Sequence, residues 1–338
     1  MKKIVTIGTG LIGKERLKAF KLLKDLGRPI ELAGIYDPYN KEIENIASEY
    51  TTKAFSNIED LISASADFYF VATPHDVAID IVEKLLASGK KVLLEKPLGR
   101  SVSEANKLVS ASKYPGQLWV GFNYRFFDGI MEALKDLKRG YFGSLISINF
   151  ILGHGGEPEM KNSWKLDPIR AGGGCLFDPG IHLLDICNLI AKMTNNNLEV
   201  KGSVSWSGFW NTGIEEECHL LLKANNFVIN LQVSIVKWRS MFTLEINGTD
   251  AYGIVTGRNR SYGNQKYIRG KRWGWLKHKN QKDSEELVSE TDGNDVFSKE
   301  MDALVFQNDQ LFIKPCSSEE ALENMKLWER CLKTLERN

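Results

Sequence analysis

The chain has 338 residues, 43% of them hydrophobic and 26% charged, which suits about two domains with apolar cores and excludes disorder throughout. The formal net charge of +1 at pH 7 gives no overall field that would attract a nucleic acid or an anionic membrane. The five cysteines contain no C-x-x-C pair, which argues against a disulfide framework or a structural zinc site and is typical of a reducing compartment.

No segment approaches the ~20 consecutive apolar residues of a membrane span. The apolar run after the two N-terminal lysines is also too short for a signal peptide. We therefore predict a cytoplasmic protein without a membrane segment.

Up to about residue 122, short apolar runs alternate with segments of helical periodicity, which is the pattern of a parallel sheet with crossover helices. The expected strands are 3–7, 30–36, 68–72, 92–94 and 118–122. The expected helices are 11–26, 41–50, 76–88 and a helix from a cap at Ser103 to about 112. This part of the chain is predicted to be a doubly wound α/β Rossmann domain, residues 1–122.

After residue 123 the rhythm changes to long alternating strands with few helices between them. Strands are expected at 145–152, 198–207, 218–223, 228–236 and 242–246, and helices at 129–138, 181–193 and 319–336. These residues, 123–338, are predicted to form an α+β domain with a large, mainly antiparallel open sheet. Its final helix could pack back on the N-terminal domain. One sheet face could meet a partner subunit, so we expect a homodimer or homotetramer.

A glycine fingerprint follows the first strand directly: Gly8-Thr9-Gly10-Leu11-Ile12-Gly13 fits G-x-G-x-x-G at the start of a helix. The first glycine would make the tight turn, the second would admit a pyrophosphate, and the third would let helix and strand pack closely. Asp37 ends the second strand, where a carboxylate binds the adenosine ribose, and no arginine is near to receive a 2′-phosphate. The cofactor is therefore predicted to be NAD rather than NADP. The alternatives are a plain glycine-rich turn and, for Asp37, a turn residue before proline.

Two further segments carry groups suited to catalysis. Glu95-Lys96-Pro97 closes a parallel strand, where open α/β sheets bind ligands, and the proline could hold a cis bond that aims Lys96 at a substrate oxygen. In the second domain, three glycines precede Asp178 and His182, a carboxylate and an imidazole four residues apart at a helix start. The alternatives are a surface lysine at a strand end, an N-cap aspartate and a satisfied, half-buried histidine.

Together these elements resemble the Gfo/Idh/MocA oxidoreductases over nearly the whole chain. The elements that carry the resemblance are residues 8–13, Asp37, Ala72-Thr73-Pro74, Glu95-Lys96-Pro97-Leu98, residues 121–126, and Gly172-Gly173-Gly174 with Asp178 and His182. The E-K-P and G-G-G…D-x-x-x-H elements in this order are highly specific. One departure is clear: where the family often has Asn and, three residues later, His, this chain has His75 and Ala78, so no cofactor contact is carried over there.

The resemblance implies roles for individual residues. Lys96, Asp178 and His182 would be the catalytic group, and Thr73 and Pro74 would flank the nicotinamide. Trp164-Lys165 resembles a substrate-proximal W-R element with lysine in place of arginine. The implied cofactor-binding set is Gly8, Gly10, Leu11, Ile12, Gly13, Asp37, Thr73, Pro74, Glu95 and Asn123. The implied substrate-binding set is Lys96, Asn123, Arg125, Trp164, Lys165, Asp178 and His182.

The expected activity is that of an NAD(P)-dependent dehydrogenase or reductase acting on CH–OH groups. It would transfer a hydride between nicotinamide and a carbon of a sugar, polyol or nucleotide-linked sugar. A second hypothesis is a lyase or hydrolase of the same family that recycles its NAD. A third is a redox-inactive NAD(H)-binding sensor. The substrate, the hydroxyl that reacts and the physiological direction are not contained in these motifs.

Residues 258–282 hold nine Lys or Arg interleaved with aromatic residues. Such a stretch is most often a solvated edge or a subunit contact, but Arg269 and Arg272 could also bind the phosphates of a nucleotide-linked sugar. Nucleic acid is the less favoured partner. The histidines show no metal-ligand spacing, so no metal is predicted, and His154 is expected in a surface loop that could border the substrate pocket.

Overall fold

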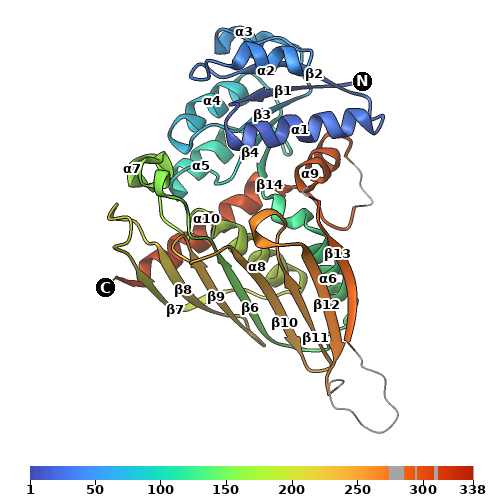
Figure 1. Ribbon diagram of the computed structural model, residues 1–338, viewed down its shortest axis with the longest axis vertical. Coiled ribbons are helices and arrows are strands. Elements are labelled where there is room, and N and C mark those ends of the chain that lie inside the picture. The colour runs from blue at the N-terminus through green and yellow to red at the C-terminus, as the bar shows by residue number, and fades with distance from the viewer. Residues whose placement is uncertain (274–284, 294, 308–310, 338) are drawn as a thin grey trace. The chain divides into compact units, whose positions relative to one another are not determined.

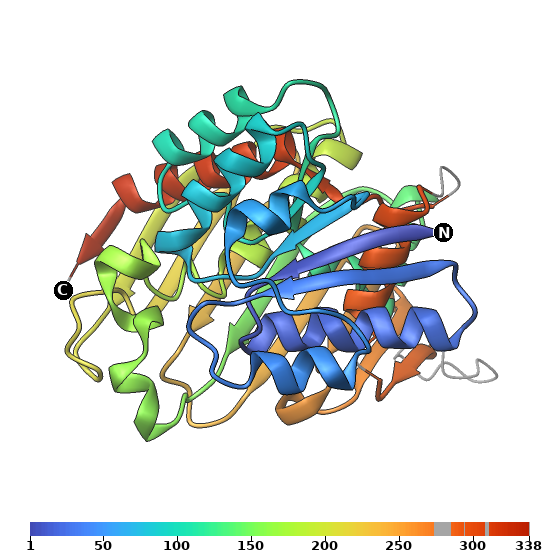
Figure 2. The same ribbon diagram turned by 90° about the horizontal axis from the view of Figure 1, so that it is seen from above.

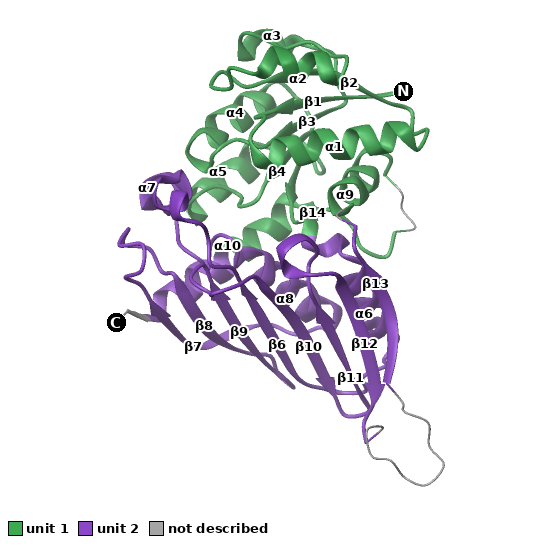
Figure 3. Ribbon diagram, in the orientation of Figure 1, with its two compact units in different colours: residues 1–123, 295–325 green, residues 124–294, 326–338 purple. Residues whose placement is uncertain are grey.

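A computed structural model describes residues 1–273, 285–293, 295–307 and 311–337. The chain forms two compact units (Figure 3). Unit 1 comprises residues 1–123 and 295–325, and unit 2 comprises residues 124–294 and 326–338. A later segment of the chain thus joins the first unit, whereas the sequence pattern suggested one boundary near residue 122.

The sheet of unit 1 has six strands and is parallel apart from one short edge strand, as predicted. Its order is β14 (Cys316–Ser317), β5 (Leu118–Gly121), β4 (Val92–Glu95), β3 (Phe68–Val71), β1 (Lys2–Ile7) and β2 (Ile30–Tyr36). The middle strands are almost wholly buried, because helices cover both faces of the sheet (Figure 2). This explains why their sequences are continuous apolar runs.

The helices of unit 1 are α1 (Leu11–Asp25), α2 (Ile43–Glu49), α3 (Ile58–Ser63), α4 (His75–Ala87), α5 (Val102–Ala111) and α9 (Val296–Val305). Helix α1 packs against α9, and α4 packs against α5. The predicted cap of α5 at Ser103 is wrong. Ser101 is extended, its hydroxyl accepts the Glu104 N–H at 3.1 Å, and the helix therefore begins two residues earlier.

The sheet of unit 2 has nine strands (Figure 1). It is antiparallel except where β6 pairs with β9 and β7 with β15, which confirms the mainly antiparallel prediction. Its order is β13 (Glu285–Thr291), β12 (Gln265–Lys271), β11 (Ala251–Thr256), β10 (Met241–Gly248), β6 (Leu145–Gly153), β9 (Val228–Ser234), β8 (Glu217–Lys223), β7 (Glu199–Trp206) and β15 (Leu335–Arg337).

Helices α6 (Asp128–Lys138) and α8 (Ile181–Met193) lie on one face of this sheet (Figure 1). The connections add α7 (Pro168–Ala171) and short 3-10 helices, namely η1 (Asn123–Phe126), η2 (Pro158–Asn162), η3 (Trp164–Leu166) and η4 (Arg260–Tyr262). The last helix, α10 (Ser318–Lys333), ends three residues before its predicted end, because residues 335–337 pair with β7 as β15. Within the described ranges, no helix has the length and apolar character needed to cross a bilayer.

Candidate cofactor and catalytic site

The glycine-rich turn between β1 and α1 has the geometry that its sequence predicts. Gly8 has a φ of +87°, and a Cβ there would lie 2.5 Å from the carbonyl oxygen of Ala72. A Cβ on Gly13 would lie 2.0 Å from the carbonyl oxygen of Gly8. Around Gly10, by contrast, a Cβ would meet nothing within 4 Å. Two glycines therefore permit tight packing, and the middle one leaves the backbone open to a ligand.

The first turn of α1 suits an anion. Gly10 is its N-cap residue, and no side chain caps the helix or places an acidic group in its first turn. Leu11 is 68% exposed, and Ile12 is partly exposed. The N–H groups of this turn are therefore available to a pyrophosphate, with the helix dipole favouring negative charge.

Asp37 closes the same turn from the end of β2. Its Oδ2 accepts hydrogen bonds from the backbone N–H and the hydroxyl of Thr9, both at 2.8 Å. Its Oδ1 accepts the Tyr39 N–H at 3.1 Å. The carboxylate is partly exposed, so it both organises the turn and stays accessible. Its role in binding ribose stays a prediction.

Thr73 and Pro74 follow β3 beside the glycine turn. The Thr73 hydroxyl is buried and has no hydrogen-bond partner within the described ranges. A Cβ on Gly8 would lie 3.1 Å from the Thr73 methyl group, and Pro74 is the N-cap residue of α4. In the described part of the chain, the Thr73 hydroxyl thus has no partner, Gly8 presents bare backbone beside it, and no side chain caps the N-terminus of α4. These three features together suit the binding of a dinucleotide.

Glu95 and Lys96 follow β4 at the carboxyl edge of the sheet. Glu95 accepts a 2.6 Å hydrogen bond from the Nε of Arg16, and Nη2 of Arg16 binds Glu300 at 2.6 Å. Arg16 is fully buried, with its guanidinium 4.9 Å from the Phe297 ring. Burial of the guanidinium works against its charge, but the two carboxylates prevail and raise the Arg16 pKa. The Lys96–Pro97 peptide is cis, as predicted, and the Lys96 side chain is partly exposed.

In unit 2, Asp178 lies in a tight turn before α8. A Cβ on Gly174 would lie 2.2 Å from the Glu215 carbonyl oxygen, so the glycine run serves a close approach of two chain segments. Asp178 binds the Lys165 ammonium at 2.9 Å, and this carboxylate raises the Lys165 pKa. The alternative of Asp178 as an N-cap is excluded, because Gly180 is the N-cap residue of α8 and no side chain caps it.

His182 lies in the first turn of α8 and is 5% exposed. Its imidazole stacks on the Tyr124 ring, with ring centroids 3.9 Å apart and planes 8° from parallel. Tyr124 also accepts a hydrogen bond from Arg258, and burial raises the Tyr124 pKa well above its ordinary value. The imidazole is therefore held in one orientation by a neutral phenol.

The motifs do not predict that Tyr124 and Arg258 belong to this cluster, and they indicate His154 only as part of a loop that could border the pocket. Tyr124 lies within the motif at residues 121–126, but the motif does not predict that its ring stacks on His182. In the sequence, Arg258 stands out only as a member of the basic stretch. Burial lowers the pKa of His154, and the charges of Lys165 and Arg258 lower it further, while Asp178 opposes them. These effects place His154 near the Lys165–Asp178 pair, which fits the hypothesis that its loop borders the pocket.

Arg125 and Asn123 occupy η1. Both oxygens of Asp185 accept hydrogen bonds from Arg125, at 2.7 and 2.6 Å, and both side chains are buried. This pair joins η1 to α8 and so positions Tyr124 and His182. Asn123 is 8% exposed, and Trp164 begins η3 next to Lys165. The substrate contacts predicted for these residues stay predictions.

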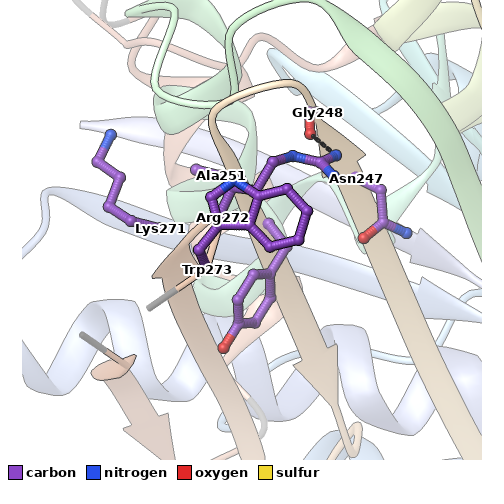
Figure 4. A pocket seen from close by; sticks show the side chains of 7 residues that line it. Asn247, Gly248, Ala251, Lys271, Arg272 and Trp273 are labelled. Carbon is purple, nitrogen blue, oxygen red and sulfur yellow. Dashed lines mark hydrogen bonds between the residues drawn. The ribbon is translucent and has the colours of Figure 1, made fainter. Parts of the chain in front are cut away.

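The described part of the basic and aromatic stretch, residues 258–273, lies along and beside β12 in the unit 2 sheet. All three nitrogens of the Arg269 guanidinium bind the carboxylates of Asp136 or Glu286. No pair of its N–H groups is therefore available to bind a phosphate. Arg272 donates to the Gly248 carbonyl oxygen beside a small cavity of about 140 Å³ (Figure 4). That volume is below the ~300 Å³ of ordinary ligand pockets. The members beyond residue 273, among them Trp275, Lys277, Lys279 and Lys282, lie outside the described residues.

No group of three or more potential metal-ligating side chains is found within the described ranges. All five cysteines are buried, and none forms a disulfide within the described ranges.

Comparison with known proteins places the chain in a family. Residues 2–122 match the model of the GFO/IDH/MocA oxidoreductase family, NAD-binding Rossmann fold, and residues 130–252 match a GFO/IDH/MocA C-terminal domain. The chain therefore belongs to the GFO/IDH/MocA oxidoreductase family, and its N-terminal part is an NAD-binding domain. This confirms the resemblance drawn from the motifs.

Among its relatives is glucose-6-phosphate 3-dehydrogenase of Bacillus subtilis (strain 168), 30% identical over 189 residues, which are 55% of this chain and 53% of that protein. Another is 2,7-anhydro-N-acetylneuraminate hydratase of Escherichia coli (strain K12), 28% identical over 258 residues, 75% of this chain and 65% of that protein. The matches thus span about half to two thirds of these relatives. A solved structure of levoglucosan dehydrogenase in complex with NADH has the same fold, with a TM-score of 0.82 and 17% identity over 98% of this chain and 96% of that one.

Proposed function

We propose that this protein is an NAD-dependent dehydrogenase or reductase acting on a CH–OH group of a sugar, polyol or nucleotide-linked sugar. The observation that carries the proposal is the ion pair of Asp178 with Lys165, in the turn that leads to the stacked His182. A domain that only binds NAD needs neither a buried imidazole stacked on a phenol nor an ion pair in the turn that precedes it. Those groups suit proton transfer and the binding of hydroxyls.

Each catalytic residue has a role in this proposal. Bound NAD would supply the hydride acceptor in the oxidative direction and the hydride donor in the reductive one. His182 takes the hydroxyl proton in the oxidative direction and returns it in the reductive one. Lys96 donates a hydrogen bond to the reacting oxygen and stabilises its negative charge. Asp178, held by Lys165, accepts a hydrogen bond from a second hydroxyl or orients His182.

The first test is an assay of NADH absorbance with a panel of polyols, aldoses and nucleotide-linked sugars. Net formation or consumption of NADH with one class supports the dehydrogenase and names its substrate. NADH binding without turnover of any panel member would instead leave the sensor as the better hypothesis.

His182→Ala tests the acid–base role. We expect kcat to fall by about 10²- to 10⁴-fold, the usual contribution of such a group, while the Kd for NADH stays within a factor of about two. His219→Ala is the matched control, because His219 lies on β8 with a 58% exposed side chain, and it should leave kcat unchanged. Equal turnover of the two variants would remove His182 from the mechanism.

A second candidate is a lyase or hydratase that oxidises and later re-reduces one sugar, which is favoured by the match to a hydratase over 75% of this chain. It predicts product formation without a net change in NADH. Product analysis beside the absorbance assay separates the two activities.

We also propose that the protein is a cytoplasmic homodimer or homotetramer. Partly exposed apolar side chains on β6, β7 and β8 support a subunit contact, among them Ile146, Val204, Trp206 and Leu221. The absence of a disulfide among the described residues is compatible with the cytoplasm. Light scattering coupled to gel filtration tests the oligomer, and a monomer at micromolar concentration would reject it.

A further inference from the structure

Arg258 is held rigidly at the end of β11. The loop that carries it is closed by the Asn259 N–H, which donates to the Gly263 carbonyl oxygen at 2.7 Å, and by the Gln265 N–H, which donates to the Asn259 side chain at 3.0 Å. The Arg258 guanidinium lies 4.1 Å from the Tyr262 ring centroid and 5.1 Å from that of Tyr124. Two aromatic rings and a hydrogen bond therefore fix the cation in place.

Within the described ranges, this guanidinium has no carboxylate partner. Its Nη1 donates to the Tyr124 hydroxyl oxygen, its Nε is enclosed without a hydrogen-bond partner, and Nη2 makes no hydrogen bond to these residues. Two other arginines of the same unit that are buried or half-buried differ: Arg125 binds Asp185, and Arg269 binds Asp136 and Glu286. Partial burial of a guanidinium between two phenol rings costs free energy of desolvation, which an anion bound to the guanidinium would offset.

Arg258, Lys165 and Asp178 together carry a net positive charge. Lys165 is matched by Asp178, so the Arg258 charge is the one left over among these three residues. Arg258 is close enough to oppose the protonation of both Lys165 and His154. A neutral sugar would leave this excess uncompensated, whereas an anionic substrate group would balance it.

The same cation is close to the proposed catalytic histidine. Tyr124 accepts a hydrogen bond from Arg258 through its hydroxyl, and its ring stacks on His182. One phenol therefore touches both the leftover cation and the catalytic imidazole, so a group bound by Arg258 belongs to the molecule that reacts.

We propose that Arg258 binds an anionic group of the substrate through Nη2, and that the substrate is consequently an acidic sugar carrying a carboxylate or a phosphate. This inference rests on the proposed function, which it narrows by excluding neutral polyols as the preferred substrates. The planar guanidinium suits either type of oxyanion, and the substrate panel below distinguishes them.

The test compares wild-type enzyme with Arg258→Gln and Arg258→Lys on matched substrates: glucose, glucuronate, glucose 6-phosphate and UDP-glucose. In the wild type, at least one acidic compound should have a kcat/KM well above that of glucose. We expect Arg258→Gln to raise the KM for that compound about 10- to 100-fold, the loss typical of a charge-assisted hydrogen bond, with Arg258→Lys between the two. The KM for NAD and that for glucose should hardly change.

Arg260→Gln is the matched control. It removes the same charge from an exposed neighbour in the same loop, and it should leave every KM unchanged. If glucose or another neutral compound is the best substrate, or if Arg258→Gln raises all KM values equally, the inference is wrong while the dehydrogenase stands.

A binding measurement separates failure of the inference from failure of the proposed function. Calorimetric titration with glucuronate and glucose 6-phosphate, in the presence of NADH, needs no turnover. Binding to the wild type that weakens about 10-fold or more in Arg258→Gln, but not in Arg260→Gln, supports the anion site even if no compound is turned over. Absence of binding by both ligands, or binding that is equal in all variants, overturns it.

Discussion

At the scale of single residues, the glycines of the β1–α1 turn should separate folding from cofactor binding. Gly13→Ala places a methyl group 2.0 Å from the Gly8 carbonyl oxygen, so the backbone must shift. We expect the free energy of unfolding to fall by about 1–3 kcal/mol, as for other overpacked sites, and NADH binding to weaken with it. Urea denaturation and fluorescence titration with NADH measure the two effects.

Gly10→Ala is the complementary variant. Nothing lies within 4 Å of a Cβ at this position, so stability should stay close to that of the wild type. The methyl group would nevertheless occupy the space that a pyrophosphate needs, and the Kd for NADH should rise. If Gly10→Ala loses stability while Gly13→Ala does not, the roles assigned to these two glycines are reversed.

The sequence predicts residues well where a short motif sets both position and chemistry. The glycine fingerprint, the cis peptide after Lys96 and the place of His182 in the first turn of a helix all follow from adjacent residues. The stacking of Tyr124 on His182 and the pairing of Arg125 with Asp185 join residues about 60 positions apart. Such partners depend on how elements pack, which one sequence does not encode locally.

At the scale of elements, the buried Arg16 on α1 forms ion pairs with Glu95 on β4 and Glu300 on α9. Arg16→Met removes the guanidinium that lies 2.6 Å from the fully buried Glu300 carboxylate. We expect the free energy of unfolding to fall by about 3–5 kcal/mol, the usual cost of breaking a buried ion pair. The double variant Arg16→Met with Glu300→Gln should lose less than the sum of the two single variants.

Arg28→Met is the matched control for the Arg16 ion pairs. Arg28 also joins α9, through Asp302, but its side chain is 43% exposed, and such pairs contribute about 1 kcal/mol or less. Chemical denaturation of the four variants measures the contrast. Equal losses for Arg16→Met and Arg28→Met would mean that burial does not strengthen the Arg16 contacts.

The loop after β6 should make stability depend on pH. Burial holds the His154 pKa below 6.5, so the folded state resists protonation more than the unfolded chain does. The corresponding stability is complete above pH 6.5 and is lost as the pH falls through the lowered folded-state value. His154→Gln should flatten the decline below pH 6.5, and should match the wild type in slope above pH 7. Denaturation curves across this range test the expectation.

Elements were predicted where periodicity is strong, and missed where it is weak. The apolar runs of β1 to β5 and the face of α8 stand out in the sequence. Strand β12, Gln265-Lys-Tyr-Ile-Arg-Gly-Lys, does not, because its buried positions are filled by Gln265, Tyr267 and Gly270 rather than by aliphatic residues. Helix α9 follows a polar connection and has only ten residues. Its buried Glu300 also weakens the apolar pattern, because the partner that justifies it, Arg16, lies 284 residues away.

At the scale of the whole molecule, neither the net charge nor the order of segments along the chain describes the local arrangement of residues. A net charge of +1 gives no overall electrostatic field, yet unit 2 holds Arg258, which has no carboxylate partner within the described residues and donates to Tyr124, the ring stacked on the proposed catalytic His182. Likewise, an apparent change of rhythm near residue 122 hides the return of residues 295–325 to unit 1. Both features arise from packing between segments that are distant in sequence, and neither alters the local motifs that identify the family.

Because the cofactor and the substrate anion are assigned to different units, each ligand should protect its own set of backbone amides from hydrogen exchange. NADH should slow exchange in the β1–α1 turn and around Thr73, because the helix N–H groups and the Thr73 hydroxyl can form hydrogen bonds to the cofactor there. An acidic sugar should slow exchange around Arg258 and in the turn before α8. Ligand at 100 times its Kd stabilises the folded state by about 2.7 kcal/mol, which is ample for detection by mass spectrometry. Arg258→Gln should abolish the second pattern and preserve the first. Loss of both patterns in that variant would mean that Arg258 supports the fold rather than the substrate.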